Sequence, residues 1–259
     1  MEFFPDNTTF LAIGPLVLRW YALAYIGGIV IGWRWARVLV QLRPAVATPL
    51  RIDEFVTWTT IGIIAGGRLG YVLFYQPARF LETPLEIFAV WQGGMSFHGG
   101  MLGVAIAVVL FCRRHKIPLL GFADRIAVVV PVGLGLGRIA NFMNGELWGR
   151  TAPDGLPWAM KFASGGDVLR HPSQLYQALL EGLLLLIIMV LLSRRETIRA
   201  RHGVLTGVFL CGYAIARIIG ELFRQPDPFL GFLFAGATMG QLLSLPMLAA
   251  GVFLVRRAR

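Results

Sequence analysis

A short polar stretch, residues 137–150, ends a long apolar run and holds residue types that suit an anion. It contains two arginines, two asparagines and a glutamate. Arg138 directly follows the uncharged run 126–137, and a permanently charged guanidinium in that place requires an anion or water beside it. The planar fork of arginine matches phosphate oxygens. The stretch therefore predicts an anion site, with Arg138 as its first candidate ligand.

Two more arginines stand among small residues in the same way. Arg68 lies in Gly67-Arg68-Leu69-Gly70, and Arg217 lies in Ala216-Arg217-Ile218-Ile219-Gly220. Small residues allow helices to approach closely in a membrane, so we expect three helices to bring the three guanidiniums together. Three unpaired charges at depth would cost on the order of 8–10 kcal/mol. Anionic partners must therefore offset that cost.

Carboxylates of the chain can supply this offset. Glu221 follows Arg217 by one helical turn and shares its face, so an ion pair is available. Glu146 follows Arg138 by eight residues, but Asn144-Gly145 between them indicates that the helix ends first. Two interpretations stay open on this pattern. The charges form internal salt bridges that hold helices in register, or they form an anion-binding site.

The candidate proton acceptor is a histidine between two glycine pairs, in Gly93-Gly94-Met95-Ser96-Phe97-His98-Gly99-Gly100. Imidazole titrates near neutral pH. His98 is also the only histidine that we place inside a membrane span, which makes it a candidate general base. A hydrogen-bonded packing histidine is the alternative.

Composition places the chain among polytopic membrane proteins. Of its 259 residues 56% are hydrophobic and 15% are charged, which is too apolar for a soluble domain. The net charge of +10 comes from basic residues in short segments between apolar runs, so it indicates membrane orientation and no nucleic-acid partner. The pattern shows no metal-type spacing and no phosphate-binding loop, so we expect no metal and no cofactor.

Crossing a bilayer takes about 20 mostly apolar residues, and seven segments meet this requirement. We expect spans at about 16–40, 54–75, 95–112, 121–141, 174–193, 203–222 and 233–255. The predicted fold is therefore all-α: a polytopic bundle of seven transmembrane helices that forms a single domain over residues 1–259.

Clusters of arginine and lysine follow the first, third, fifth and seventh spans, so all four lie on one side. The positive-inside rule makes that side cytoplasmic. The N-terminus is then outside and the C-terminus is in the cytoplasm. Residues 142–173, between spans four and five, are long and rich in Gly, Pro and Trp. We expect an ordered extracytoplasmic insertion there, and a simple linker is the alternative.

The stretch 137–149 closely resembles the signature of the bacterial phosphatidylglycerol:prolipoprotein diacylglyceryl transferase family. The resemblance extends over nearly the whole chain, through the segments 19–21, 66–71, 94–100, 171–176 and 223–227. Residues 151–170 are shorter than in some members.

The resemblance implies a multi-pass enzyme of the bacterial inner membrane that uses no cofactor. Its partners would be phosphatidylglycerol, membrane lipids and the signal peptide of a preprolipoprotein. The diacylglyceryl group would pass to the thiol of the lipobox cysteine, forming a thioether and releasing glycerol 1-phosphate. Such chemistry requires a thiolate and stabilised charge on the departing phosphate.

The resemblance and the residue types together give each side chain an expected role. Arg138 and Arg217 hold the lipid phosphate and stabilise it as the leaving group. Asn141 and Glu146 order the site, and Glu221 orients Arg217.

The remaining expected roles concern the thiol and the lipid head group. His98 deprotonates the thiol, and an arginine-polarised glutamate is the alternative base. Tyr21 bonds the head group, and Arg68 and Gly149 are further phosphatidylglycerol-binding candidates.

Two other classes of protein are alternatives to the transferase. A transporter or flippase for an anionic lipid or solute would use the same arginines. It usually contains an internal duplication with broken helices, which is not found. An intramembrane protease would require a serine and histidine pair or paired aspartates, and the sequence offers no convincing arrangement of either kind.

Overall fold

The computed structural model describes residues 9–13, 16–226 and 231–258. The chain is mostly helical, and its contacts divide it into two compact units. The first unit comprises Met1–Trp35 and Asp124–Arg259, and the second comprises Ala36–Ala123.

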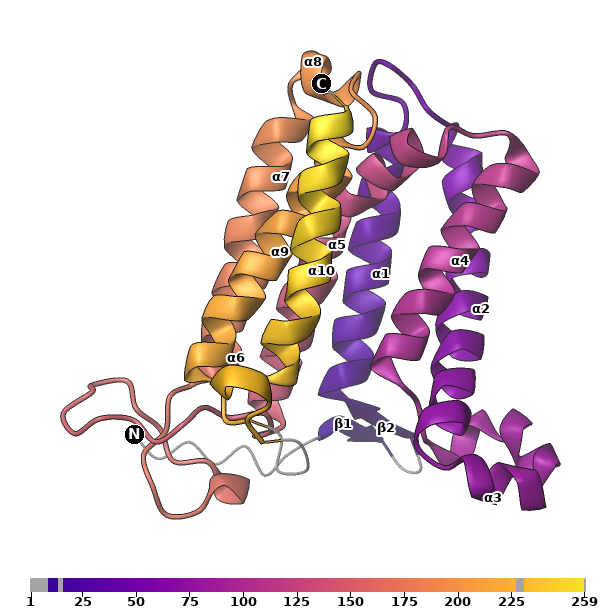
Figure 1. Cartoon of the computed structure of the whole chain (residues 1–259). Helices are drawn as coiled ribbons and strands as arrows, with labels where there is room; N and C mark the ends of the chain where they lie inside the picture. Colours follow the sequence, from indigo (N-terminus) through magenta and orange to yellow (C-terminus); the bar gives the residue numbers. More distant parts are fainter. Residues whose placement is uncertain (1–8, 14–15, 227–230, 259) are drawn as a thin grey trace. The chain divides into compact units, whose positions relative to one another are not determined.

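The elements that lie in the first unit, or extend into it, follow one another along the chain. They are β1 (Thr9–Ile13), β2 (Leu16–Arg19), α1 (Trp20–Leu39), α5 (Leu119–Met143), η3 (Ala163–Gly165), α6 (Ser173–Gln177), the π-helix η4 (Ala178–Leu184), α7 (Leu185–Ser193), α8 (Glu196–Arg199), α9 (Val204–Phe223), η5 (Phe234–Gly236) and α10 (Met239–Arg257) (Figure 1). The second unit holds α2 (Pro49–Phe74), α3 (Pro77–Glu82), η1 (Pro84–Phe88), η2 (Val90–Gln92) and α4 (Phe97–His115).

Among the described residues, five helices are long and apolar enough to cross a membrane. They are α1, α5, the continuous segment Ser173–Ser193, α9 and α10. Helices also occupy the second and third predicted spans, as α2 and α4, and these two are not among the five. The structure therefore confirms a mostly helical membrane protein with five candidate spans.

Two predicted spans begin too early. Residues 16–19 form β2, which pairs antiparallel with β1 through Leu11↔Leu18 and Ala12↔Val17, so that α1 begins at Trp20. Apolarity alone cannot distinguish a short strand from a helix end, and the partner strand decides between them. The last helix begins at Met239, because Thr238 and Gln241 form a reciprocal capping box there.

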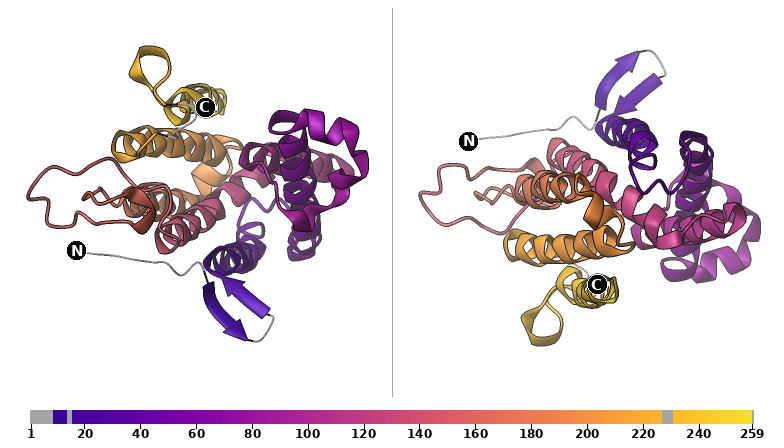
Figure 2. Two further views of the ribbon diagram at one scale, coloured as in Figure 1. Left: turned by 90° about the horizontal axis from the view of Figure 1, so that it is seen from below. Right: turned by 90° about the horizontal axis from the view of Figure 1, so that it is seen from above.

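Glycines set the close packing inside each unit. In the second unit α2 and α4 lie side by side (Figure 2), and a Cβ atom at Gly66 would lie 2.8 Å from the Cα of Gly103. In the first unit α9 packs along α10, where a Cβ at Gly207 would lie 2.7 Å from the carbonyl oxygen of Gly251. Such contacts allow backbones to approach as membrane helices require.

The start of α9 is held by a side chain from α5. Asp124 is fully buried, and its carboxylate accepts hydrogen bonds from the backbone N–H groups of Gly203 and Thr206 and from the Thr206 hydroxyl, each at 2.7 Å. Gly203 has a φ of +102°, which favours glycine. Because the first N–H groups of a helix lack partners of their own, Asp124 joins the two helices at this end.

Candidate active site

The centre of the site is a buried carboxylate shared by two arginines. Glu181 has no exposed surface. Its Oε2 atom accepts a hydrogen bond from Nε of Arg138 at 2.9 Å and lies 2.9 Å from Nη2 of the same guanidinium. Its Oε1 atom lies 3.8 Å from Nη1 of Arg217. The structure thus confirms that Arg138 and Arg217 come together, and it adds a glutamate that the sequence interpretation did not include.

The local backbone explains how Glu181 reaches both arginines. Residues 178–184 form a π-helix, a wider turn that is frequent at functional sites. Gly182 in this turn packs against Gly135 of α5, where a Cβ atom on Gly182 would lie 2.6 Å from the Gly135 Cα. Gly135 is three residues before Arg138, so this contact brings the helix that bears Arg138 against the turn that bears Glu181.

We expect Gly182→Ala to disrupt this arrangement, because the added methyl group forces the two backbones apart. A displacement of about 1 Å in a catalytic group can lower the rate about 100-fold, so we expect a loss of transfer activity of that order. The control is Gly133→Ala on α5, whose new Cβ would meet no heavy atom within 4 Å. Equal activity of the two variants, measured as product per unit time, would contradict the role of this contact.

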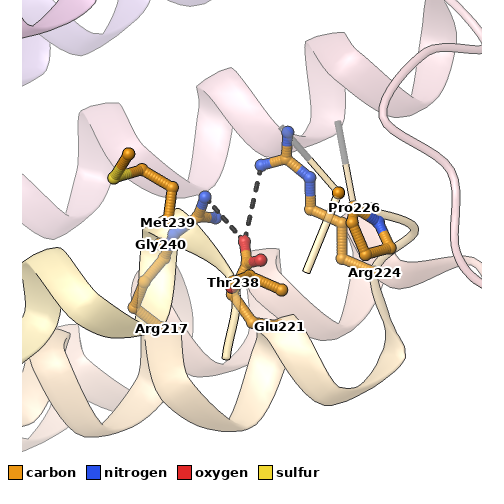
Figure 3. Close-up of a pocket in the computed structure, with 8 residues that line it drawn as sticks. Arg217, Glu221, Arg224, Pro226, Thr238, Met239 and Gly240 are labelled. Carbon is orange, nitrogen blue, oxygen red and sulfur yellow. Dashed lines mark ion pairs between the residues drawn. The ribbon is translucent and has the colours of Figure 1, made fainter. Parts of the chain in front are cut away.

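A second carboxylate on α9 extends the cluster. Oε1 of Glu221 lies 2.8 Å from Nη2 of Arg217, which confirms the ion pair expected from their spacing, and 3.7 Å from Nη1 of Arg224 (Figure 3). Gly240 lies beside Glu221, and a Cβ atom there would be 2.9 Å from the carboxylate. These residues border a pocket lined by Arg217, Glu221, Arg224, Pro226, Gly231, Thr238, Met239 and Gly240.

Three further predicted residues meet at the end of α5. The Tyr21 hydroxyl donates to Oε1 of Glu146 and accepts a hydrogen bond from the Asn141 amide. The Asn141 amide also donates to Oε1 of Glu146, at 3.0 Å. The carboxylate of Glu146 is therefore fixed by two neutral donors, whereas the ion pair of Arg138 goes to Glu181.

The turn after α5 places Glu146 there. The helix ends at Met143, as expected from Asn144-Gly145, and Gly145 has a φ of +64°. The backbone carbonyl of Glu146 accepts from the fully buried amide of Gln174 at 2.7 Å. The carbonyl of Leu147 accepts from the Ser173 hydroxyl at 3.0 Å. The first turn of α6 thus holds the position of Glu146.

Gly149 lies where three backbone segments converge. Its N–H donates to the carbonyl of His171 at 3.0 Å, and its backbone forms a bridge with Arg224. A Cβ atom would lie 2.8 Å from the carbonyl oxygen of Phe223. Close packing of the backbone therefore requires glycine at position 149. The predicted contact of Gly149 with lipid remains a prediction.

Side chains of the segment 142–173 contact one another and the end of α9. The Trp148 indole donates to the Ser164 hydroxyl at 3.1 Å, and the guanidinium of Arg170 lies 3.9 Å from the centre of the Trp148 ring. Arg150 donates to the carbonyls of Arg224 and Glu221, both at 3.1 Å. Partial burial lowers the pKa of His171 below its usual value.

Arg68 and His98 belong to the second unit. The guanidinium of Arg68 is buried and donates to four backbone carbonyls. These are Ile87 at 2.9 Å, Gly93 at 2.6 Å, Gly94 at 3.2 Å and Glu86 at 2.5 Å. Arginine has five N–H donors. Arg68 therefore uses most of its donors to bind the backbone of the segment that leads to α4. His98 is exposed in the first turn of α4.

Glu181 could have been found by the argument that singled out Arg138. It is the only charged residue between Leu175 and Ser193, and an ionisable group inside a membrane span is a functional candidate by default. Arg224 was part of a matching motif but received no role. Within the described ranges, no group of three or more His, Cys, Asp and Glu side chains is arranged to hold a metal ion.

The fold and the site define a helical membrane protein with an arginine and glutamate cluster buried among its helices. Residues 8–257 match the model of a family described as prolipoprotein diacylglyceryl transferase. The chain belongs to this family, which confirms the resemblance drawn from its motifs.

Individual relatives agree with this assignment. A phosphatidylglycerol--prolipoprotein diacylglyceryl transferase of Gluconacetobacter diazotrophicus is 59% identical over 246 residues, which cover 95% of this chain and 88% of the relative. Proteins of the same description from Acidiphilium cryptum and Nitrobacter winogradskyi are 56% and 54% identical, over 95% and 96% of this chain and 90% and 87% of their own lengths.

Proposed function

We propose that this chain transfers the diacylglyceryl group of phosphatidylglycerol to the lipobox cysteine of preprolipoproteins in the bacterial inner membrane. The relatives carry the name of this activity over nearly their whole length. The observation that carries the proposal is the shared glutamate. Two arginines, Arg138 and Arg217, converge on the buried Glu181, and Arg224 joins Arg217 through Glu221.

The charges of this cluster leave it suited to an anion. Arg138, Arg217 and Arg224 contribute three positive charges against two negative charges of Glu181 and Glu221. The excess positive charge lies in surroundings of low dielectric constant, where its attraction for a phosphate is strong. Arginine also offers the paired N–H geometry that phosphate oxygens accept. Salt bridges and anion site, which were alternatives on the sequence, are therefore two parts of one arrangement.

In the proposed reaction the cysteine thiolate attacks the glyceryl carbon that bears the phosphate ester. A C–S bond forms and the C–O bond breaks, and its electron pair stays on the phosphate oxygen of departing glycerol 1-phosphate. The thiol proton passes to a base. Arg138 and Arg217 stabilise the charge that grows on the phosphate, which is the step where fixed donors contribute most to catalysis.

Two groups are proposed as the base. His98 carries an imidazole, the side chain that most often serves as a general base. The carboxylate of Glu146 already accepts hydrogen bonds from Tyr21 and Asn141 on its Oε1 atom. Because these contacts engage Glu146 in holding Tyr21 and Asn141, His98 is the proposed base and Glu146 orders the site. Tyr21, Arg68 and Gly149 are proposed as further contacts to the lipid.

The remaining proposals concern the membrane. We propose that α2 and α4 cross it together with the five candidate spans, with the N-terminus outside and the C-terminus in the cytoplasm. Residues 142–173 would then form an extracytoplasmic insertion. This orientation places Glu146 at the outer surface, where the cysteine of a secreted preprolipoprotein arrives.

The test of the function is mass spectrometry of a lipobox peptide incubated with phosphatidylglycerol and the purified protein. We expect the peptide to gain the mass of one diacylglyceryl group, and a peptide with serine in place of the cysteine to gain none. Cleavage of the peptide would instead support a protease. An unchanged peptide, with folded protein and lipid transport into vesicles, would support a flippase.

The choice of base makes a separate prediction. We expect His98→Gln to lower the turnover number by about 100-fold or more, because general base catalysis contributes about 10²- to 10⁴-fold. Raising the pH should restore part of the rate in this variant, because more of the peptide thiol is then ionised. The matched comparison is Glu146→Gln. We expect its turnover number to fall as well, but not to recover when the pH is raised. Near-normal turnover of His98→Gln would remove His98 from this role.

A further inference from the structure

One fully buried side chain beside the cluster takes no part in the proposed reaction. Gln177 lies at the end of α6 and has no exposed surface. Neither its amide nitrogen nor its amide oxygen has a hydrogen-bond partner within the described parts of the chain. A buried amide left unpaired destabilises the fold, so this residue calls for a specific explanation.

The surroundings of Gln177 place it at the anion site. It stands one turn before Glu181 on the same helical segment. On α9 it lies against Gly220, where a Cβ atom would be only 3.3 Å from its amide nitrogen. Gly220 is three residues after Arg217 and directly precedes Glu221. The glycine therefore leaves room for the amide between the two ion-paired helices.

Other buried polar atoms near Gln177 also lack a hydrogen-bond partner in the described part of the chain. Oε1 of Glu181, Nη1 of Arg217 and Oε1 of Glu221 are buried, and within the described residues none of them makes a hydrogen bond of normal geometry. A phosphate can engage the arginine. An amide, with one donor and one acceptor side, instead matches a group that both donates and accepts, and the hydroxyl group is the simplest of these.

We propose that Gln177 recognises the glycerol hydroxyls of the phosphatidylglycerol head group and thereby selects this lipid among anionic phospholipids. The proposal rests on the proposed function and adds its head-group specificity. Gln177 lies one turn nearer than Glu181 to the end of the helix where Gln174 bonds to the carbonyl of Glu146. With the phosphate on Arg138 and Arg217, this places the amide on the polar side of the phosphodiester, where the head-group glycerol must lie.

The experiment compares two lipids with identical acyl chains and equal charge. Phosphatidylglycerol carries the head-group hydroxyls, and phosphatidylpropanol lacks them. For each lipid, kcat/KM is measured by mass spectrometry of the lipobox peptide, and equilibrium binding to the solubilised protein is measured in parallel. We expect the wild type to prefer phosphatidylglycerol at least about 10-fold, the value of a well-made hydrogen bond at about 1.4 kcal/mol.

The decisive variant is Gln177→Met, which keeps the length of the side chain and removes the amide. We expect kcat/KM for phosphatidylglycerol to fall about 10-fold or more while that for phosphatidylpropanol stays within about twofold, so that the preference disappears. Gln177→Asn, which retracts the amide by one carbon, serves if the methionine variant does not fold. It should retain an intermediate preference.

Gln174→Met is the matched control. Gln174 is equally buried and lies on the same helix, but its amide nitrogen donates to the carbonyl of Glu146. Removing this amide should therefore lower kcat/KM for both lipids by the same factor. The proposal would be overturned if Gln177→Met lowered kcat/KM for both lipids equally, or if the preference for phosphatidylglycerol over phosphatidylpropanol stayed unchanged. If the wild type transfers neither lipid, the proposed function fails, and the head-group preference is still decided by the binding measurement.

Discussion

Replacing Arg138 by lysine is expected to lower kcat/KM for diacylglyceryl transfer by about 10²- to 10³-fold, the effect of removing one well-placed donor from a charge-stabilising site. Nε of Arg138 donates to Oε2 of Glu181, and Nη2 lies 2.9 Å from the same oxygen, so one edge of the guanidinium faces this carboxylate. A lysine ammonium can keep the ion pair, but it lacks the planar fork that engages a second anion at the same time.

The chain contains a close geometric match for this substitution. Arg79 likewise places Nε and Nη2 against a single oxygen of Glu86, at 3.0 and 2.7 Å, but its side chain is 53% exposed. Exposed ion pairs contribute about 0–1 kcal/mol, so Arg79→Lys should keep the rate within about twofold. Full activity of Arg138→Lys would show that the fork is not required and would contradict the proposed role.

The second large effect is expected for Glu181→Ala. Breaking a buried ion pair by removing one partner costs about 3–5 kcal/mol, because the other charge stays buried and uncompensated. Two arginines lose their shared carboxylate here, so we expect a clear fall of the thermal unfolding midpoint in detergent. The comparison is Glu86→Ala, which breaks an exposed pair and should change the midpoint by little.

The kinetics of Glu181→Gln separate positioning from simple stability. The amide keeps the shape of the side chain but removes the charge that orients both guanidiniums. We expect kcat to fall at least about 10-fold while KM for phosphatidylglycerol does not rise, because the cluster gains net positive charge and still binds the anion. A variant with normal kcat and raised KM would show that Glu181 acts on lipid binding alone.

Sequence patterns located the helices because hydropathy and the length of a bilayer span constrain them strongly. They also located local pairs, as the four-residue spacing of Arg217 and Glu221 shows. Helix starts were less predictable, since β2 depends on pairing with β1 and α10 depends on the capping box at Thr238. Both features depend on specific contacts that the hydropathy of the sequence does not predict.

The centre of the site was harder to predict because its partners are distant along the chain. Arg138 and Glu181 are 43 residues apart, and they meet only because a π-helix and the contact between Gly135 and Gly182 bring them together. The backbone carbonyls that accept hydrogen bonds from Arg68 likewise cannot be predicted from residue types, because every residue has a carbonyl group. Gln177 gave no signal at all, because a glutamine in a span becomes notable only when its partners are known.

The most direct test of the account is a structure of the protein with phosphatidylglycerol bound, and the distances from its phosphate oxygens to the two arginines. Charge-assisted hydrogen bonds to guanidinium are shorter than about 3 Å. The account predicts such contacts to both Arg138 and Arg217, with Glu181 between them. A phosphate more than about 5 Å from both guanidiniums, beyond the reach of any such bond, would contradict it.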